Sequence, residues 1–220
     1  MKTHITALAV LCLTLAVAPA SAQQDLYDNG PINGTTDAWT INFGFVIGDS
    51  FTLLNNSTVG GFNFGVWESQ GDVLTSVDWS ITSYPVGGTV YGSGTASGRN
   101  LTDQFISVNQ YGYDIDKITV AGLNVSLTSG LTYWLNLQNA MVPSGNPVYW
   151  DENSGIDCGG DDGKGGGCPS VASSGGVGTD PSEAFTINGP GGGSTPEPSS
   201  FMLFGSGILS LAGVLHRKLF

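Results

Sequence analysis

The central part of this 220-residue sequence contains no histidine and very few basic residues. His4 and His216 lie near the two ends, so the residues between them offer neither a Ser-His-Asp or Cys-His triad nor a histidine-ligated zinc site. Residues 23–195 hold all but one of the 18 acidic residues and only half of the six Lys and Arg residues. Because a body this acidic repels polyanions, we expect no binding to nucleic acid.

Cysteine is also scarce, with three residues in the whole chain. Cys12 lies in an apolar stretch near the N-terminus, which leaves Cys158 and Cys168 on either side of a glycine-rich segment. In an oxidising compartment an even number of cysteines predicts a disulfide, here between Cys158 and Cys168. A pair of free thiols is the alternative, and a metal site is less favoured because no histidine completes the ligand set.

The N-terminal residues have the three parts of a Sec-type signal peptide. Lys2 supplies a positive charge, residues 5–17 are apolar, and Ala20 and Ala22 are small residues before a cleavage point. We expect signal peptidase to remove residues 1–22 and leave Gln23 as the first residue of the mature chain. A buried N-terminal helix is the alternative.

The C-terminal residues form a second apolar run, from Phe201 to Leu215, which Arg217 and Lys218 follow closely. A helix of this length spans roughly 22 Å, compared with about 30 Å for the hydrocarbon core of a bilayer. The run therefore predicts a short transmembrane helix that stays in the inner membrane only transiently, with its basic end in the cytoplasm.

Residues 196–220 resemble the PEP-CTERM sorting signal of bacterial surface proteins. In that signal a Pro-Glu-Pro motif, a short apolar helix and a basic end occur in this order, and the matching residues here are Pro196, Glu197, Pro198, Arg217 and Lys218. The resemblance implies that a membrane-embedded exosortase cleaves near the motif and passes the protein to the cell surface or extracellular matrix. An ordinary C-terminal anchor helix is the alternative, and both interpretations place the body outside the cytoplasm.

Residues 23–188 show no helical periodicity but many short segments rich in β-branched and aromatic residues, which Gly, Asn, Asp and Ser separate. The predicted strands are 39–46, 50–54, 59–67, 73–82, 89–96, 104–108, 116–127, 131–137 and 184–187. In the first of them, Trp39, Ile41, Phe43 and Phe45 are expected to share one side. A shift in the apolar alternation near Ala121 and Gly122 predicts a β-bulge.

About nine or ten strands at regular spacing predict an all-β fold, an antiparallel β-sandwich of jelly-roll type at 23–188. A glycine-rich linker at 189–195 then leads to the tail. Segments 62–67, 77–81 and 130–135 resemble uncharacterised sandwich domains of PEP-CTERM proteins, which implies a fold without assigning an activity.

Carboxylates are the remaining candidates for catalysis and for metal binding. Glu68, Glu152 and Glu183 are the glutamates of the body, but the sequence places no pair of carboxylates in a shared cleft, so we expect no enzyme. The group that contains Asp151, Asp157, Asp161 and Asp162 is dense enough to predict a calcium site, with a solvated acidic loop as the alternative. No other cofactor is expected.

Aromatic residues beside polar groups are the remaining candidates for a binding site. Tyr111, Tyr113, Tyr149 and Trp150 are candidate contacts for a glycan, whereas most aromatic residues in strands belong to the core. The leading hypothesis is a non-catalytic exported protein of the surface or extracellular matrix, sorted by exosortase. The alternative is a module that binds an extracellular polysaccharide, with calcium as a candidate aid.

Overall fold

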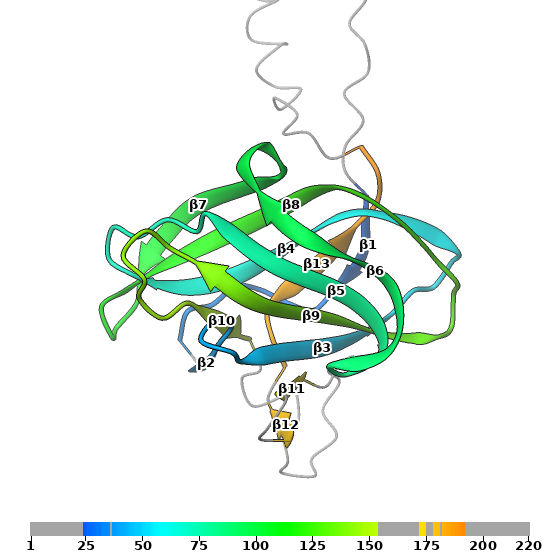
Figure 1. The fold of residues 1–220 in the computed structure, drawn as a ribbon, viewed down its shortest axis with the longest axis horizontal. Coiled ribbons are helices and arrows are strands. Elements are labelled where there is room, and N and C mark those ends of the chain that lie inside the picture. Colours follow the sequence, from blue (N-terminus) through cyan, green and yellow to red (C-terminus); the bar gives the residue numbers. More distant parts are fainter. Residues whose placement is uncertain (1–23, 36, 154–171, 175–177, 181, 192–220) are drawn as a thin grey trace, which may run out of the picture. The chain divides into compact units, whose positions relative to one another are not determined.

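Two antiparallel β-sheets enclose a common apolar core in the computed structural model (Figure 1). The structure describes residues 24–35, 37–153, 172–174, 178–180 and 182–191. Within these ranges there is no α-helix, and the one 3₁₀ helix, η2, covers Gly98–Asn100. The all-β class predicted from the sequence is confirmed, while the jelly-roll connectivity stays a prediction.

The seven-stranded sheet is built around β4 (Ser57–Ser69), which pairs with three other strands, β8, β10 and β13. β8 (Tyr113–Leu127) pairs along one edge of β4, and β7 (Leu101–Val108) pairs with β8. β13 (Phe185–Asn188) and β10 (Tyr149–Glu152) share the other edge of β4, one after the other. On this side the outermost strands are β1 (Asp25–Asp28), which pairs with β13, and β2 (Asp37–Thr40), which pairs with β10.

The six-stranded sheet lies across the core from the first. Its strands, in spatial order, are β12 (Gly178–Asp180), β11 (Ala172–Ser174), β3 (Val46–Thr52), β9 (Thr132–Met141), β5 (Ser76–Tyr84) and β6 (Gly87–Ser97). β5 and β6 form a hairpin about Pro85 and Val86, between the strands predicted at 73–82 and 89–96.

Alternate residues of each strand supply the core, because successive side chains of a strand point to opposite faces of the sheet. On β4 the inward positions carry Phe62, Phe64 and Val66, all fully buried. Rings of the two sheets meet in edge contacts, such as Phe62 with Trp79, whose centroids lie 6.2 Å apart. Burial of each such side chain contributes about 1.5–3 kcal/mol to folding.

The β-bulge that the sequence predicts in strand β8 is confirmed. The register between β4 and β8 moves from Val59 opposite Val125 to Gly61 opposite Ala121, so β8 holds extra residues at this point. Gly122 has a φ of +84°, a conformation that glycine adopts without steric cost. The buried positions accordingly change phase, from Ile118 and Val120 before the bulge to Val125 and Leu127 after it.

The single strand predicted over residues 39–46 is wrong. The chain leaves the seven-stranded sheet at Thr40 and enters the six-stranded sheet at Val46, with a turn in which Phe45 N donates to Asn42 O at 3.0 Å. Phe43 and Phe45, expected on the same side as Ile41, are 64% and 51% exposed, whereas Ile41 is fully buried. The apolar alternation continues through a connection between sheets, which periodicity alone does not distinguish from a strand.

The described strands all belong to one compact unit, Gln23–Gly193. The predicted signal peptide and sorting tail lie outside the described residues, and the domain boundaries stay predictions. Among the residues that the structure does describe, no helix is sufficiently long and apolar to span a bilayer.

Gly61 offers a test of the bulge. A Cβ atom at this position would overlap the carbonyl oxygen of Val120 on the paired strand. We expect Gly61→Ala to lower the free energy of unfolding by about 1–3 kcal/mol in urea denaturation. Gly94→Ala is the control, because its Cβ would meet only the Trp79 ring, at an ordinary 3.4 Å. Equal stability of the two variants would contradict the described register.

Candidate functional site

Three aromatic residues selected from the sequence gather around Trp67 on the outer face of the seven-stranded sheet. The Tyr111 ring stacks on Trp67, with centroids 5.7 Å apart and an interplanar angle of 25°. Tyr113 lies 6.0 Å from Trp67, and Tyr149 meets Tyr113 edge-on at 5.7 Å. We call Trp67, Tyr111, Tyr113 and Tyr149 the tyrosine face. Tyr111 is 58% exposed, whereas Trp67 is almost fully covered.

Strand register brings these rings together. Trp67 of β4 lies opposite Tyr149 of β10, and Ser69, two residues along the same face, lies opposite Tyr113 of β8. Tyr111 is in the turn before β8, where the Asn109 side-chain oxygen accepts the backbone N–H groups of Tyr111 and Tyr113 at 2.9 and 3.0 Å. The turn therefore holds the exposed ring over the sheet.

Asp151 is a buried carboxylate directly beside this face. Its Oδ1 accepts the Trp67 indole N–H at 2.6 Å and the Gly34 backbone N–H at 3.0 Å. Its Oδ2 accepts the Asn33 backbone N–H at 2.8 Å. Burial raises the pKa of Asp151 and outweighs these three hydrogen bonds, each of which lowers it. The carboxylate fixes the indole of Trp67 and ties the 29–35 segment to the sheet.

The prediction that Trp150 contacts a glycan is wrong, because its side chain is fully buried. Its Nε1 donates to the Ala184 carbonyl at 3.0 Å, and its ring packs edge-on against Phe64 and Phe185. No strand was predicted between 137 and 184, whereas residues 149–152 form strand β10. In a strand Tyr149 and Trp150 point to opposite faces, so only Tyr149 reaches the surface.

The calcium prediction remains untested for most of its residues. Asp157, Asp161 and Asp162 lie outside the described residues, as do Cys158 and Cys168 of the predicted disulfide. Both side-chain oxygens of Asp151 already accept hydrogen bonds. Within the described ranges no three His, Cys, Asp or Glu side chains are grouped so as to hold a metal ion. A calcium site at Asp151 and the residues after it stays a prediction.

A group of carboxylates that was not predicted from the sequence lies on the inner side of β4 and β8. Glu68 follows Phe62, Phe64 and Val66 on the core-facing side, opposite Asp114, while Asp116 lies opposite Val66. Glu68 is fully buried, and neither carboxylate oxygen has a hydrogen-bond partner among the described residues. The sequence alternation along β4 could have predicted the burial of Glu68, because Glu68 follows Phe62, Phe64 and Val66 at the same two-residue spacing.

Burial raises the pKa of Glu68 to about 8, and repulsion from Asp103, Asp116, Asp72 and Asp114 adds to the effect. Burial together with Asp103 and Asp114 raises the pKa of Asp116 to about 7. At neutral pH Glu68 is therefore mostly protonated. A neutral Glu68 carboxyl avoids the cost of an isolated buried charge.

A separate buried network joins the two sheets around Asp49 of β3. Asp49 Oδ2 accepts the Asn29 amide and the Ser182 hydroxyl, both at 3.1 Å, and the Glu183 backbone N–H at 2.7 Å. Glu183 in turn pairs with Glu152 across an antiparallel bridge. All of these residues are buried, and the network links β3 of one sheet to the segments that border β10 of the other.

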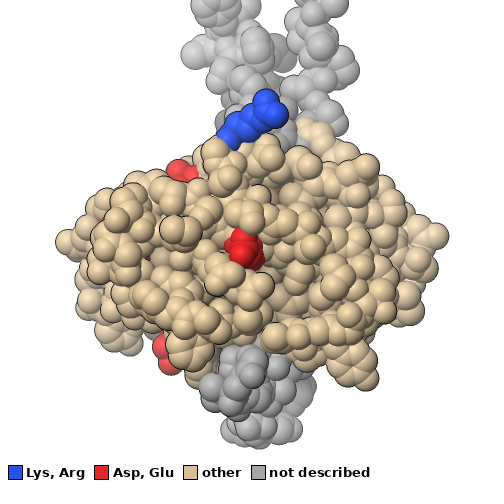
Figure 2. All heavy atoms as spheres, viewed as in Figure 1, with Lys and Arg blue, Asp and Glu red and all other residues tan. Residues whose placement is uncertain are grey.

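Exposed charge is sparse on the face of the molecule in Figure 2, which shows a small acidic patch near its middle and a basic side chain at its upper margin. The acidic residues of the body therefore do not gather into a large field on this face.

Comparison with known families identifies the tail. The model of the PEP-CTERM protein-sorting motif matches residues 194–218, which include the Pro-Glu-Pro motif and the basic end predicted from the sequence. No curated protein matches the chain. The chain carries a PEP-CTERM sorting motif, as predicted, and this motif indicates an exported protein that exosortase processes from a membrane-anchored intermediate.

Glu68 gives the folded body a pH-dependent stability. Below about pH 4.5 the carboxyl is protonated in both states; between there and its folded pKa of about 8 only the folded chain keeps the proton. The free energy of unfolding therefore falls as the pH rises through this window. Glu68→Gln should remove roughly 2–4 kcal/mol of this fall between pH 5 and pH 8 in urea denaturation.

Asp25→Asn, at an exposed position of β1, is the control and should keep the native slope. Identical pH profiles for the native chain and Glu68→Gln would show that Glu68 is not the buried acid described above.

Proposed function

We propose that this chain is a non-catalytic exported protein of the cell surface or extracellular matrix, delivered there by exosortase. The observation that carries the proposal is the sorting motif at residues 194–218, which follows an all-β body. In this proposal signal peptidase removes residues 1–22, the tail holds the chain briefly in the inner membrane, and exosortase then releases the body.

The positions of the glutamates support a role without catalysis. Glu68, Glu152 and Glu183 are all 1% exposed or less. General acid–base chemistry requires a carboxyl group within hydrogen-bond reach of the substrate, and a polymer reaches none of these three in the described structure. The absence of histidine from residues 5–215 supports the same proposal.

The sorting step is tested by deletion of residues 196–198. We expect the precursor to remain in the inner membrane, because the exosortase recognition motif is lost. Fractionation and immunoblotting of the producing cells give the distribution, and deletion of residues 191–193, which shortens the chain equally, is the control. Release of the 196–198 deletion at the native level would contradict exosortase processing.

A second candidate function is the binding of an extracellular polysaccharide through the tyrosine face. The observation that favours it is the exposed Tyr111 ring, which the Asn109 turn and Trp67 hold in a fixed orientation. Flat aromatic rings with an apolar surface and a polar edge suit the C–H face and hydroxyl groups of a sugar. Of the predicted calcium residues, Asp151 lies in β10 and the other three follow it in the sequence, so calcium stays a candidate aid to this function.

Tyr111→Ala tests this second function. We expect about tenfold weaker binding to exopolysaccharide purified from the producing cells, measured by isothermal titration calorimetry, because a stacking surface is lost. Tyr84→Ala removes a ring that is 70% exposed on the other sheet and should not change binding. Equal affinity of the native chain and Tyr111→Ala would exclude the tyrosine face.

A further inference from the structure

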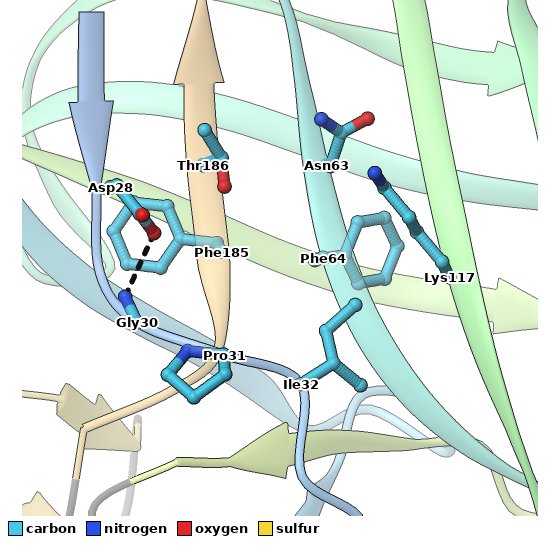
Figure 3. A pocket seen from close by; sticks show the side chains of 9 residues that line it. All are labelled: Asp28, Gly30, Pro31, Ile32, Asn63, Phe64, Lys117, Phe185 and Thr186. Carbon is cyan, nitrogen blue, oxygen red and sulfur yellow. Dashed lines mark hydrogen bonds between the residues drawn. The ribbon is translucent and has the colours of Figure 1, made fainter. Parts of the chain in front are cut away.

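A groove of about 340 Å³ opens on the outer face of the seven-stranded sheet (Figure 3). Side chains from three adjacent strands line it: Thr186 of β13, Asn63 of β4 and Lys117 of β8. Pro31 and Ile32 form a wall, and Asp28 of β1 lies on the opposite side from Lys117. This volume is within the usual range for sites that bind small ligands.

Strand register places the polar groups of the groove close together. Thr186 lies directly opposite Asn63, and Lys117 lies opposite Gly65, two residues further along β4 on the same face. The side chains of Asn63, Lys117 and Thr186 are half-buried and form no hydrogen bond or ion pair with any residue that the structure describes. Their hydrogen-bonding capacity is therefore available to a ligand.

The wall of the groove is held against the sheet. A Cβ atom on Gly65 would come within 2.7 Å of the Ile32 side chain, so glycine at this position allows Ile32 to pack directly on β4. Asp28 Oδ1 accepts the Gly30 backbone N–H at 2.9 Å and fixes the turn that leads into the wall. The groove is thus preformed.

The chemistry of the groove matches a sugar ring. An ammonium, an amide, a hydroxyl and a carboxylate supply both donors and acceptors for hydroxyl groups, and Pro31 and Ile32 supply an apolar surface for ring C–H groups. The strong excess of acidic residues in the body disfavours a polyanion, which favours an uncharged ligand.

We propose that this groove binds one pyranose residue of a neutral extracellular polysaccharide, with Lys117 and Asn63 donating hydrogen bonds to its hydroxyl groups. The proposal rests on the second candidate function and adds a second contact point to it. Tyr113 and Lys117 lie on the same face of β8, four residues or about 13 Å apart. A short stretch of one polymer spans this distance, so the tyrosine face and the groove serve one ligand.

The experiment measures the binding of neutral exopolysaccharide, purified from the producing cells, to the mature protein and its variants by calorimetry. We expect Lys117→Ala and Asn63→Ala each to weaken binding by about tenfold, because each removes a donor to a sugar hydroxyl. Arg99→Ala removes a positive charge from the exposed η2 segment and is the control, with no expected change. Thermal melting confirms folding, since neither Lys117 nor Asn63 has a described side-chain bond to lose.

The outcomes separate this proposal from the one on which it rests. Loss of binding in Tyr111→Ala with native binding in Lys117→Ala and Asn63→Ala overturns the groove and leaves the tyrosine face in place. Loss in the groove variants with native binding in Tyr111→Ala supports the groove and excludes the tyrosine face. Native binding in all variants, or no binding by the native protein, overturns both. If the protein bound alginate, a polyuronate, more strongly than the neutral polysaccharide and lost this binding in Lys117→Ala, the groove would bind an acidic sugar. That result would overturn the proposal of a neutral ligand.

Discussion

The buried carboxylate of Asp151 is the interaction on which the outer face of the seven-stranded sheet depends. It holds the Trp67 indole on one side and the backbone of Asn33 and Gly34 on the other. Trp67 is the base on which Tyr111 stacks, and the 29–35 segment supplies the wall of the groove. A single carboxylate thus positions both features to which we assign binding. Removal of a buried acceptor with three donors typically costs several kcal/mol, because the donors lose their partner.

On the inner side of the same sheet a buried carboxyl group is accommodated in a different way. Glu68 continues the series of core positions on β4 but introduces a carboxyl where the preceding residues are apolar. With other carboxylates nearby and no cation among its described neighbours, Glu68 is accommodated by keeping its proton. The two faces of the sheet therefore accommodate buried carboxyl groups differently. On the outer face Asp151 accepts three hydrogen bonds, and on the inner face Glu68 stays protonated.

The sequence predicted most features that depend on local pattern. Alternation identified β4 and β8, the phase change near Gly122 located the bulge, and the Pro-Glu-Pro motif with its basic end identified the tail. Prediction from the sequence failed where the pattern of apolar residues did not correspond to the strands of the structure. Phe43 and Phe45 extend an apolar series through a turn between sheets, and no strand was predicted at 149–152, where β10 points Trp150 into the core.

The groove was beyond prediction for a physical reason. Asp28, Asn63, Lys117 and Thr186 are far apart in the sequence and meet only because β13 and β8 pair with opposite edges of β4 and β1 pairs with β13. A single sequence contains no local signal for that arrangement. The tyrosine face was partly predictable, since Tyr111, Tyr113 and Tyr149 were selected as aromatic positions beside polar groups. Their gathering around Trp67, however, depends on the pairing of β4 with β8 and β10.

The most direct test of this account is a map of backbone amide chemical shifts in the isotopically labelled mature protein as exopolysaccharide from the producing cells is added. The account predicts changes concentrated on residues 61–69 of β4, on residues 111–119 of β8 and the turn before it, and on the 29–35 segment, with β5, β6 and β9 unaffected. Changes confined to the six-stranded sheet, or no changes at saturating polysaccharide, would contradict the claim that the outer face of the seven-stranded sheet is the binding surface of this exported protein.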